Sequence, residues 1–282
     1  MDFLLILLFT TVHCLFNPAG AAPIPLEMVD MTYVFDNDTL HWPTADKFQL
    51  LVRANGTTEA GFWLQMESLF SGVHVGTHMD APCHFAKGSW CIDKIPLNHL
   101  VAPAAVIDIT KQAEQDRDYL VQVHDLIQWE IFSGRSLDGT IIMLRSGWGR
   151  RWGNRESFTG TPGNDTTQLH FPGMSAEASA WLVENRSVYG VGTETLSTDN
   201  GRSQDFMAHR ILHAANIFGL ENVANVEKIP IYGATLYVMP MKIGNASGAP
   251  VRIIATFPKP MFAAQSGKFN PQSFLRPMTF YY

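Results

Sequence analysis

Short apolar runs and amphipathic segments alternate along the chain, a pattern typical of a mixed α/β protein. The apolar runs are rich in β-branched residues and predict buried strands at Val101–Ile109, Gly139–Leu144, Val188–Gly192, Ala234–Met239 and Val251–Phe257. Helices are predicted at Val123–Trp129 and at Ser175–Leu182, where the Ser175 hydroxyl can cap the first turn. This mixture predicts the α/β fold class, with the elements arranged around a substantial sheet.

The N-terminal segment differs from the rest of the chain. Phe3–Phe16 is strongly apolar and is followed by Pro18 and by the small residues Ala19–Ala21. This order predicts a secretory signal peptide over residues 1–21 and a single domain over residues 22–282. Because a positively charged start is missing, an uncleaved anchor is the alternative, although the run is shorter than the ~18 apolar residues of a membrane span. No later stretch is apolar for long enough to span a membrane.

Sequons for N-glycosylation occur along the whole chain, at Asn37, Asn55, Asn164, Asn185 and Asn245. With the signal peptide they predict a secreted glycoprotein of a eukaryote, located outside the cell or in the lumen of the secretory pathway.

The composition narrows the class of partner. Apolar residues make up 46% of the 282 residues and charged residues only 16%, so the chain is neither disordered nor typical of a nucleic-acid-binding protein. A formal net charge of −6 also disfavours polyanionic partners. A small-molecule substrate is therefore expected.

The segment from His74 to His84 carries the main chemical signal. It holds three imidazoles and the Asp80 carboxylate, the ligand types of a catalytic divalent-metal site. In a regular strand His74 and His78 would lie about 13 Å apart, too far to share an ion. The segment must therefore bend, and Gly76 and Pro82 suit an irregular loop. The alternative of buried structural histidines is disfavoured by the cost of burying so many polar groups together.

The spacing His-x-Gly-Thr-His-x-Asp-x-Pro-x-His resembles the signature of the metal-dependent cyclase hydrolase family, which includes bacterial kynurenine formamidases and isatin hydrolases. The downstream segment from His209, with Glu221 twelve residues later, resembles the second metal-ligand block of that family. Weaker similarities lie at Arg145–Trp148, Phe171–Gly173 and Val191–Ser197, where Glu194 replaces a frequent Asp. The resemblance covers roughly residues 26–258 and implies the swivelling β/β/α architecture of a single domain.

His209 and Glu221 can meet only if the chain turns between them. On one unbroken helix they would lie about 18 Å apart along the axis. Asn216 and Gly219 are suitable signals for a helix end. His213 could pair with His209 as in His-Glu-x-x-His enzymes, but the Glu of that motif is missing, so His213 is expected to support a ligand or to pack.

Mapped by motif position, the resemblance implies one divalent ion held by His74, His78, Asp80 and Glu221 and a second held by Asp80, His209 and Glu221. Zinc suits these ligands, and manganese is the alternative. Such ions can generate hydroxide from water and polarise a carbonyl, while His84 would act as the catalytic proton shuttle. The implied enzyme is a metal-dependent amidohydrolase that cleaves a non-peptide C–N bond, in an aryl formamide such as N-formylkynurenine or a cyclic amide such as isatin. The alternative is a secreted metal-binding pseudoenzyme or binding protein that retains the fold.

Other residues are candidates of lower rank. Trp148, His170, Phe62 and Trp63 could line a substrate pocket, although large aromatic side chains more often belong to the core. Cys83 and Cys91 could form a disulfide or stay as buried thiols, and a Cys83 thiolate ligand is the competing interpretation. A homodimer or higher homo-oligomer is expected, and the segment from Pro258 onward is expected to wrap the surface or a partner subunit.

Overall fold

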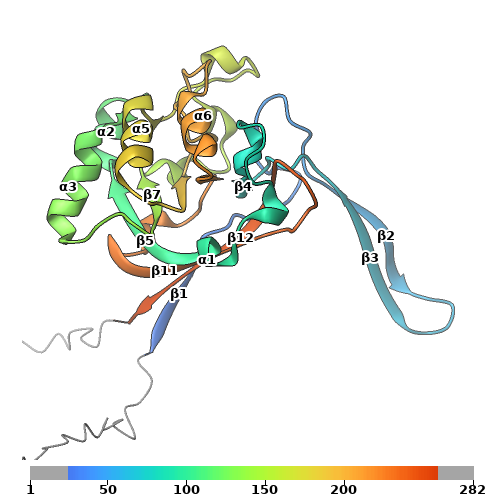
Figure 1. Cartoon of the computed structure of the whole chain (residues 1–282). Coiled ribbons are helices and arrows are strands. Elements are labelled where there is room, and N and C mark those ends of the chain that lie inside the picture. The colour runs from blue at the N-terminus through green and yellow to red at the C-terminus, as the bar shows by residue number, and fades with distance from the viewer. Residues whose placement is uncertain (1–24, 260–282) are drawn as a thin grey trace, which may run out of the picture. The chain divides into compact units, whose positions relative to one another are not determined.

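The structure, a computed structural model, describes residues 25–259, and Leu26–Pro258 form one compact unit (Figure 1). The predicted signal peptide and the segment beyond Lys259 lie outside the described residues.

An eight-stranded mixed sheet runs in the order β1-β12-β11-β5-β7-β9-β10-β4, and a further pairing of β12 with β4 closes seven of these strands into a ring. In chain order the strands are β1 (Leu26–Asp30), β4 (His78–Asp80), β5 (Val101–Asp108), β7 (Ile141–Arg145), β9 (Gly190–Thr193), β10 (Phe218–Glu221), β11 (Tyr232–Pro240) and β12 (Gly248–Pro258). The pairs β5–β7, β7–β9 and β9–β10 are parallel, and β4 is antiparallel to both of its neighbours.

Strand β7 shows why the central strands are uniformly apolar. Ile141 and Met143 point into the core within the ring, while Ile142 and Leu144 point into the core beneath the helices. All four side chains are buried, as expected for a parallel strand covered on both faces.

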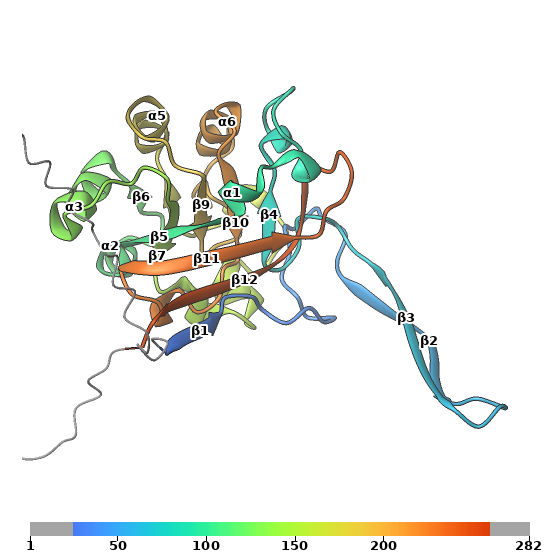
Figure 2. The same ribbon diagram turned by 60° about the horizontal axis from the view of Figure 1, so that its bottom comes forward.

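The helices α3, α5 and α6 cover one side of the sheet (Figures 1 and 2). Leu126 of α3, Leu182 of α5 and Leu212 of α6 pack in one cluster with the sheet. The helices are α1 (Leu97–Leu100), α2 (Thr110–Gln115), α3 (Val123–Ser133), α4 (Arg155–Thr159), α5 (Ala176–Asn185) and α6 (Met207–Ala214), with the short 3₁₀ helices η1 (Pro82–His84), η2 (Ile92–Lys94), η3 (Trp148–Arg151), η4 (Thr166–Gln168) and η5 (Val226–Lys228). The short strands β6 (Leu120–Val121) and β8 (Gly173–Met174) pair separately. Among the helices of residues 25–259, none has the length and apolar composition needed to cross a lipid bilayer.

The elements predicted from periodicity are confirmed. Each predicted strand and helix overlaps an observed one, and Ser175 caps α5 by accepting a hydrogen bond from the Ala178 amide at 3.0 Å. One detail was wrong. Asn216 follows α6 with a left-handed φ of 59°, but Gly219 lies inside β10 and ends no helix. A Cβ at Gly219 would lie 3.3 Å from Asp80 Cβ, so this glycine makes room for Asp80 instead.

A long antiparallel hairpin extends away from the sheet (Figures 1 and 2). It consists of β2 (Gln49–Thr57) and β3 (Trp63–Phe70). Its apolar side chains are exposed, including Val52 at 62% and Trp63 at 64%. The described part of the chain therefore leaves an apolar hairpin without a cover.

Candidate metal centre

The motif segment bends as its spacing requires. Gly76 adopts a φ of 58°, and a Cβ there would lie 2.7 Å from Phe35 Cζ, so both the backbone conformation and the packing require glycine. After this turn β4 begins at His78, and the ring centroids of His74 and His78 are 5.3 Å apart. The bend thus brings two imidazoles of the motif to one place.

Strand pairing and the helix α6 bring residues from later in the chain to the motif segment. Glu221 of β10 lies opposite His78 of β4, and α6 carries His209 to the same point. Residues that are 129 positions apart in sequence, Asp80 and His209, are therefore in contact at 3.1 Å.

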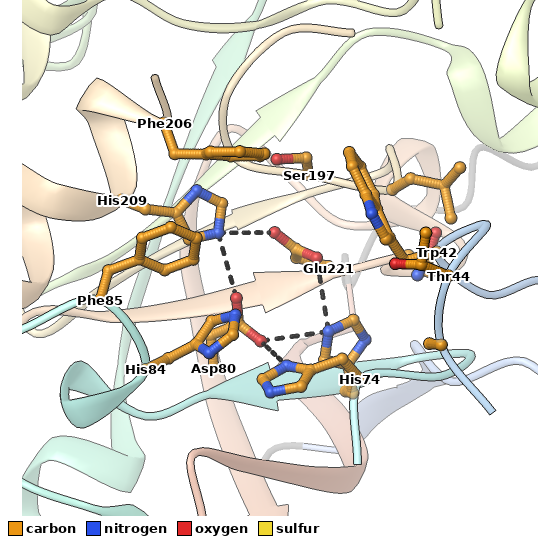
Figure 3. A pocket seen from close by; sticks show the side chains of 14 residues that line it. Trp42, Thr44, His74, Asp80, His84, Phe85, Ser197, Phe206, His209 and Glu221 are labelled. Carbon is orange, nitrogen blue, oxygen red and sulfur yellow. Dashed lines mark hydrogen bonds and ion pairs between the residues drawn. The ribbon is translucent and has the colours of Figure 1, made fainter. Parts of the chain in front are cut away.

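The contacts divide into two sides that share both carboxylates (Figure 3). Asp80 Oδ1 lies 2.6 Å from His74 Nδ1 and 3.1 Å from His78 Nε2, and Glu221 Oε2 lies 3.3 Å from His78 Nε2. The other oxygens, Asp80 Oδ2 and Glu221 Oε1, each lie 3.1 Å from His209 Nε2. Two potential metal-binding groups result: His74, His78 and Asp80, and Asp80, His209 and Glu221.

The imidazoles of the cluster lower the pKa of both carboxylates. Burial by itself would raise the pKa of Asp80, but the imidazoles of His74, His209 and His78 hold it well below its usual range. The pKa of Glu221 is also lowered, since His209 and His78 outweigh burial and the repulsion from Asp80. The imidazoles thus favour the ionised form of both buried carboxylates, which is the form that binds a metal ion. The Nε2 atom of His78 is buried and lies 3.1 Å from Asp80 Oδ1, but it forms no well-directed hydrogen bond within the described residues, as expected of an atom that binds a metal ion.

Hydrogen bonds outside the cluster orient the imidazoles. His78 Nδ1 lies 2.9 Å from the carbonyl oxygen of Gly76, and His209 Nδ1 lies 2.6 Å from Asp199 Oδ2. Asp199 also accepts hydrogen bonds from the backbone amides of Ala208 and His209 in the first turn of α6. It therefore fixes both the helix that carries His209 and the direction of the ring.

A cavity of about 290 Å³ opens onto the cluster (Figure 3). Trp42, Phe85 and Phe206 form aromatic walls, with Phe206 ring centroids 5.3 Å from Phe85 and 6.0 Å from Trp42. The full lining consists of Trp42, Thr44, Ala45, His74, His78, Asp80, His84, Phe85, Leu196, Ser197, Phe206, His209, Glu221 and Asn222. The cavity thus combines the ionisable residues of the cluster at its base with aromatic walls suited to a flat apolar ring.

His84 lies in this cavity but belongs to neither potential metal-binding group. Its ring stacks on His74 with centroids 4.0 Å apart. Burial lowers the pKa of His84 to about 4, against the attraction of Asp80 and with a further contribution from His74. The imidazole is therefore neutral near pH 7 and can accept a proton.

The neighbouring Cys83 forms a disulfide with Cys91. Of the alternatives for this residue, the disulfide is confirmed and the thiolate ligand is excluded. The disulfide closes a short loop directly after the Asp80 strand.

His213 is buried, its ring centroid lies 5.2 Å from that of His209, and it belongs to neither potential metal-binding group. This position agrees with the expected packing role.

The residues expected to contact a substrate lie elsewhere. Trp148 is 1% exposed, and its indole donates to the carbonyl oxygen of Phe158, so it packs in the core, the alternative role expected for a large aromatic residue, and does not line this cavity. His170 pairs with Asp118 at 2.6 Å outside the cavity. Phe62 and Trp63 lie on the hairpin and do not line the cavity of the same chain, because β2 and β3 extend away from the sheet. Glu194 anchors the loop after β7, since its carboxylate accepts hydrogen bonds from the amides of Ser146 and Gly147.

All the sequon asparagines are exposed: Asn37, Asn55, Asn164, Asn185 and Asn245. Burial therefore prevents none of them from carrying a glycan.

Known proteins share this architecture. A family profile named Cyclase matches residues 29–200. An isatin hydrolase from Roseibium aggregatum is 34% identical over 196 residues, which cover 67% of this chain and 73% of that protein. A kynurenine formamidase from Salinibacter ruber is 25% identical over 229 residues, which cover 81% of this chain and 97% of that protein. The structure of isatin hydrolase A from Ralstonia solanacearum matches with a TM-score of 0.75 and 31% identity over 82% of this chain and 92% of that one.

Proposed function

Because the chain belongs to the Cyclase family of metal-dependent hydrolases, we propose that it hydrolyses a non-peptide C–N bond in a small molecule, an aryl formamide such as N-formylkynurenine or a cyclic amide such as isatin. The family, the fold class and the enzyme class expected from the sequence are confirmed by these similarities.

One observation carries the proposal. His74, His78, Asp80, His209 and Glu221 converge from β4, the segment before it, α6 and β10, and the two carboxylates face both sides of the cluster. These residues would hold one or two divalent ions, zinc by the donor set or manganese as the alternative. An ion bound here would polarise the substrate carbonyl and make a water molecule more acidic.

His84 is the residue placed to move a proton. It faces the same cavity as Asp80 and Glu221 without joining either potential metal-binding group. In the proposed reaction water adds to the carbonyl carbon, a C–O bond forms, the C–N bond breaks, and His84 transfers one proton of the water to the departing nitrogen, while the second proton is released to solvent when the acid ionises. The products are a carboxylate and an amine, which stay joined when the substrate is cyclic.

The aromatic walls support an aryl substrate. Trp42, Phe85 and Phe206 present apolar rings across a cavity of about 290 Å³. A flat ring placed between them would bury apolar surface while its carbonyl meets the ionisable residues at the base of the cavity.

The proposal is tested by measuring metal content and hydrolysis in the same preparation. The full-length protein should contain zinc or manganese and should hydrolyse N-formylkynurenine or isatin, whereas chelator treatment should abolish activity and added metal should restore it. Folded protein that binds metal but hydrolyses none of a panel of aryl formamides and cyclic amides would favour a metal-binding pseudoenzyme. Folded protein without micromolar affinity for either ion would contradict the metal centre itself.

We further propose that the protein is a secreted glycoprotein that forms a homodimer or higher homo-oligomer. The apolar N-terminal segment and the exposed sequons support export. The uncovered hairpin β2–β3 supports self-association, because contiguous exposed apolar surface on a soluble protein commonly marks an interface.

A further inference from the structure

His74 is the most accessible of the three imidazoles of the cluster. Its side chain is 21% exposed, whereas those of His78 and His209 are 2% and 4% exposed. Burial alone therefore does not fix its ring, and the direction of the ring must depend on specific contacts.

We propose that Ser247 is a positioning residue that holds the His74 imidazole in its metal-binding orientation, and that it does so with the same hydroxyl group that the Asn245 sequon requires. The inference rests on the metal centre of the proposed function.

The two ring nitrogens of His74 have different hydrogen-bond partners. Nδ1 lies 2.6 Å from Asp80 Oδ1 and faces the cluster, while Nε2 lies 3.0 Å from Ser247 Oγ on the other side. When Nδ1 binds a metal ion, Nε2 carries the hydrogen and donates it to the serine hydroxyl. A backbone carbonyl serves His78 and a carboxylate serves His209 in the same way.

The backbone around Ser247 forms a fixed support for the ring. Its carbonyl oxygen accepts a hydrogen bond from the Ala81 amide at 2.8 Å, and Gly248 pairs with Asp80 where β12 meets β4. A Cβ at Gly248 would lie 2.7 Å from His74 Cε1, so the ring occupies the space that this glycine leaves. The imidazole is thus confined by Gly248, by the Ser247 hydroxyl and by the stacked ring of His84.

The segment before Ser247 is hydrogen-bonded to the residues that directly follow the disulfide loop. The carbonyl oxygen of Ala246 accepts a hydrogen bond from the Ile92 amide at 3.0 Å, and the Asn245 amide donates to Asp93 Oδ1 at 3.0 Å. The Asn245 side chain remains exposed. Asn245 can therefore carry a glycan at the surface while the hydroxyl of its own sequon points inward to His74.

The Ser247 hydroxyl both completes the Asn245 sequon and bonds to His74. Two sets of variants distinguish these two roles. Asn245→Gln removes the sequon and keeps the hydroxyl. Ser247→Thr keeps both, and Ser247→Val has nearly the same shape as threonine but lacks the hydroxyl. Ser247→Ala removes the hydroxyl with the smallest change in volume.

The test measures zinc affinity of the full-length protein by competition with a chelator. We expect Ser247→Ala and Ser247→Val to bind zinc roughly 10- to 100-fold more weakly than wild type, the range typical of losing a partner of a metal-bound histidine. Ser247→Thr and Asn245→Gln should bind like wild type. The Thr and Val variants form a pair that differs by one hydroxyl, so their comparison holds even if the alanine variant folds poorly.

Other results would contradict either the role of Ser247 or the metal centre itself. Equal zinc affinity in the Thr and Val variants would overturn the role of the hydroxyl while leaving the proposed function intact. An equal loss in Asn245→Gln and Ser247→Ala would assign the effect to the sequon instead and would also overturn the inference. A wild-type protein without measurable zinc or manganese affinity would refute the proposed metal centre on which the inference rests.

Discussion

Two carboxylates determine how the residues of the centre cooperate. Asp80 turns Oδ1 toward His74 and His78 and turns Oδ2 toward His209. A single substitution at Asp80 therefore disturbs both sides, whereas a histidine serves only one.

The first prediction follows from this sharing. Asp80→Ala should remove more metal than His209→Ala, because the group of His74, His78 and Asp80 survives the second change. Elemental analysis of folded, dialysed protein measures the difference. An equal or greater loss in His209→Ala would show that the carboxylate is not shared.

The second prediction concerns His84. His84→Ala should lower kcat by roughly 10²–10⁴-fold, as for the loss of a general acid–base group, while metal content stays near that of wild type. His74→Ala is the matched control and should lose metal and activity together. If both variants lose metal equally, His84 is a ligand and the proton-transfer role is wrong.

The sequence predicted the site residues that cluster within one short segment, and it missed those that contribute from isolated positions. Three histidines and an aspartate within one short segment are recognisable without a structure. Ser247 contributes one hydrogen bond from a distant part of the chain, Asp199 acts from the loop ten residues before His209, and serine and aspartate are common everywhere. Trp42 and Phe206 reach the cavity through irregular segments whose course no periodicity predicts.

At the scale of elements, the loop closed by the Cys83–Cys91 disulfide directly follows β4, the strand that carries His78 and Asp80. Cys83 and Cys91 are eight residues apart and enclose the turn that follows β4. The Cys83 amide also donates to the Trp90 carbonyl oxygen at 2.9 Å. The loop is therefore fixed by one covalent bond and by backbone hydrogen bonds.

The third prediction concerns the stability that this bond contributes. Replacing both cysteines by serine should lower the free energy of unfolding by about 2–3 kcal/mol, because a short closed loop restricts the unfolded chain. Denaturant titration measures the change. A reducing agent should destabilise wild type by a similar amount and leave the double variant unaffected, and an equal effect on both proteins would contradict the assignment.

Elements with a clear burial pattern were predictable, and the hairpin was not. The strands β5 and β7 and the helix α5 carry local signals of composition and capping that their surroundings reinforce. In β2 and β3 apolar residues lie on exposed positions, so no alternation between buried and exposed faces marks them.

At the scale of the whole molecule, the fourth prediction tests self-association through the hairpin. Each apolar side chain buried at an interface contributes about 1.5–3 kcal/mol, so replacing Val52, Trp63 and Leu69 by serine should weaken the dimer by roughly 10³-fold or more. Analytical ultracentrifugation measures the dissociation constant. Serine at Ile131 and Phe132 of α3, which are 68% and 74% exposed, is the control and should leave association unchanged. A monomeric wild-type protein would contradict the proposal.

The fifth prediction concerns export. The mature chain should begin near Ala22 or Pro23 and should lose mass on treatment with a glycosidase. N-terminal sequencing and mass spectrometry of protein from a eukaryotic host decide this. An intact Met1 on protein without glycans would contradict it.

The position of β12 in the ring also has a consequence for the order of biosynthesis. This strand, the last one within residues 25–259, pairs with β1 and β4 from the early part of the chain, and its Arg252 binds Asp30 across 222 residues. A ribosome must therefore release nearly the whole described chain before the strand that carries His78 and Asp80 gains its second neighbour. Pairings of such long range form slowly and expose unpaired strand edges in the meantime. The site should accordingly remain incomplete until β12 has left the ribosome, and the nascent enzyme should depend on chaperones during that interval.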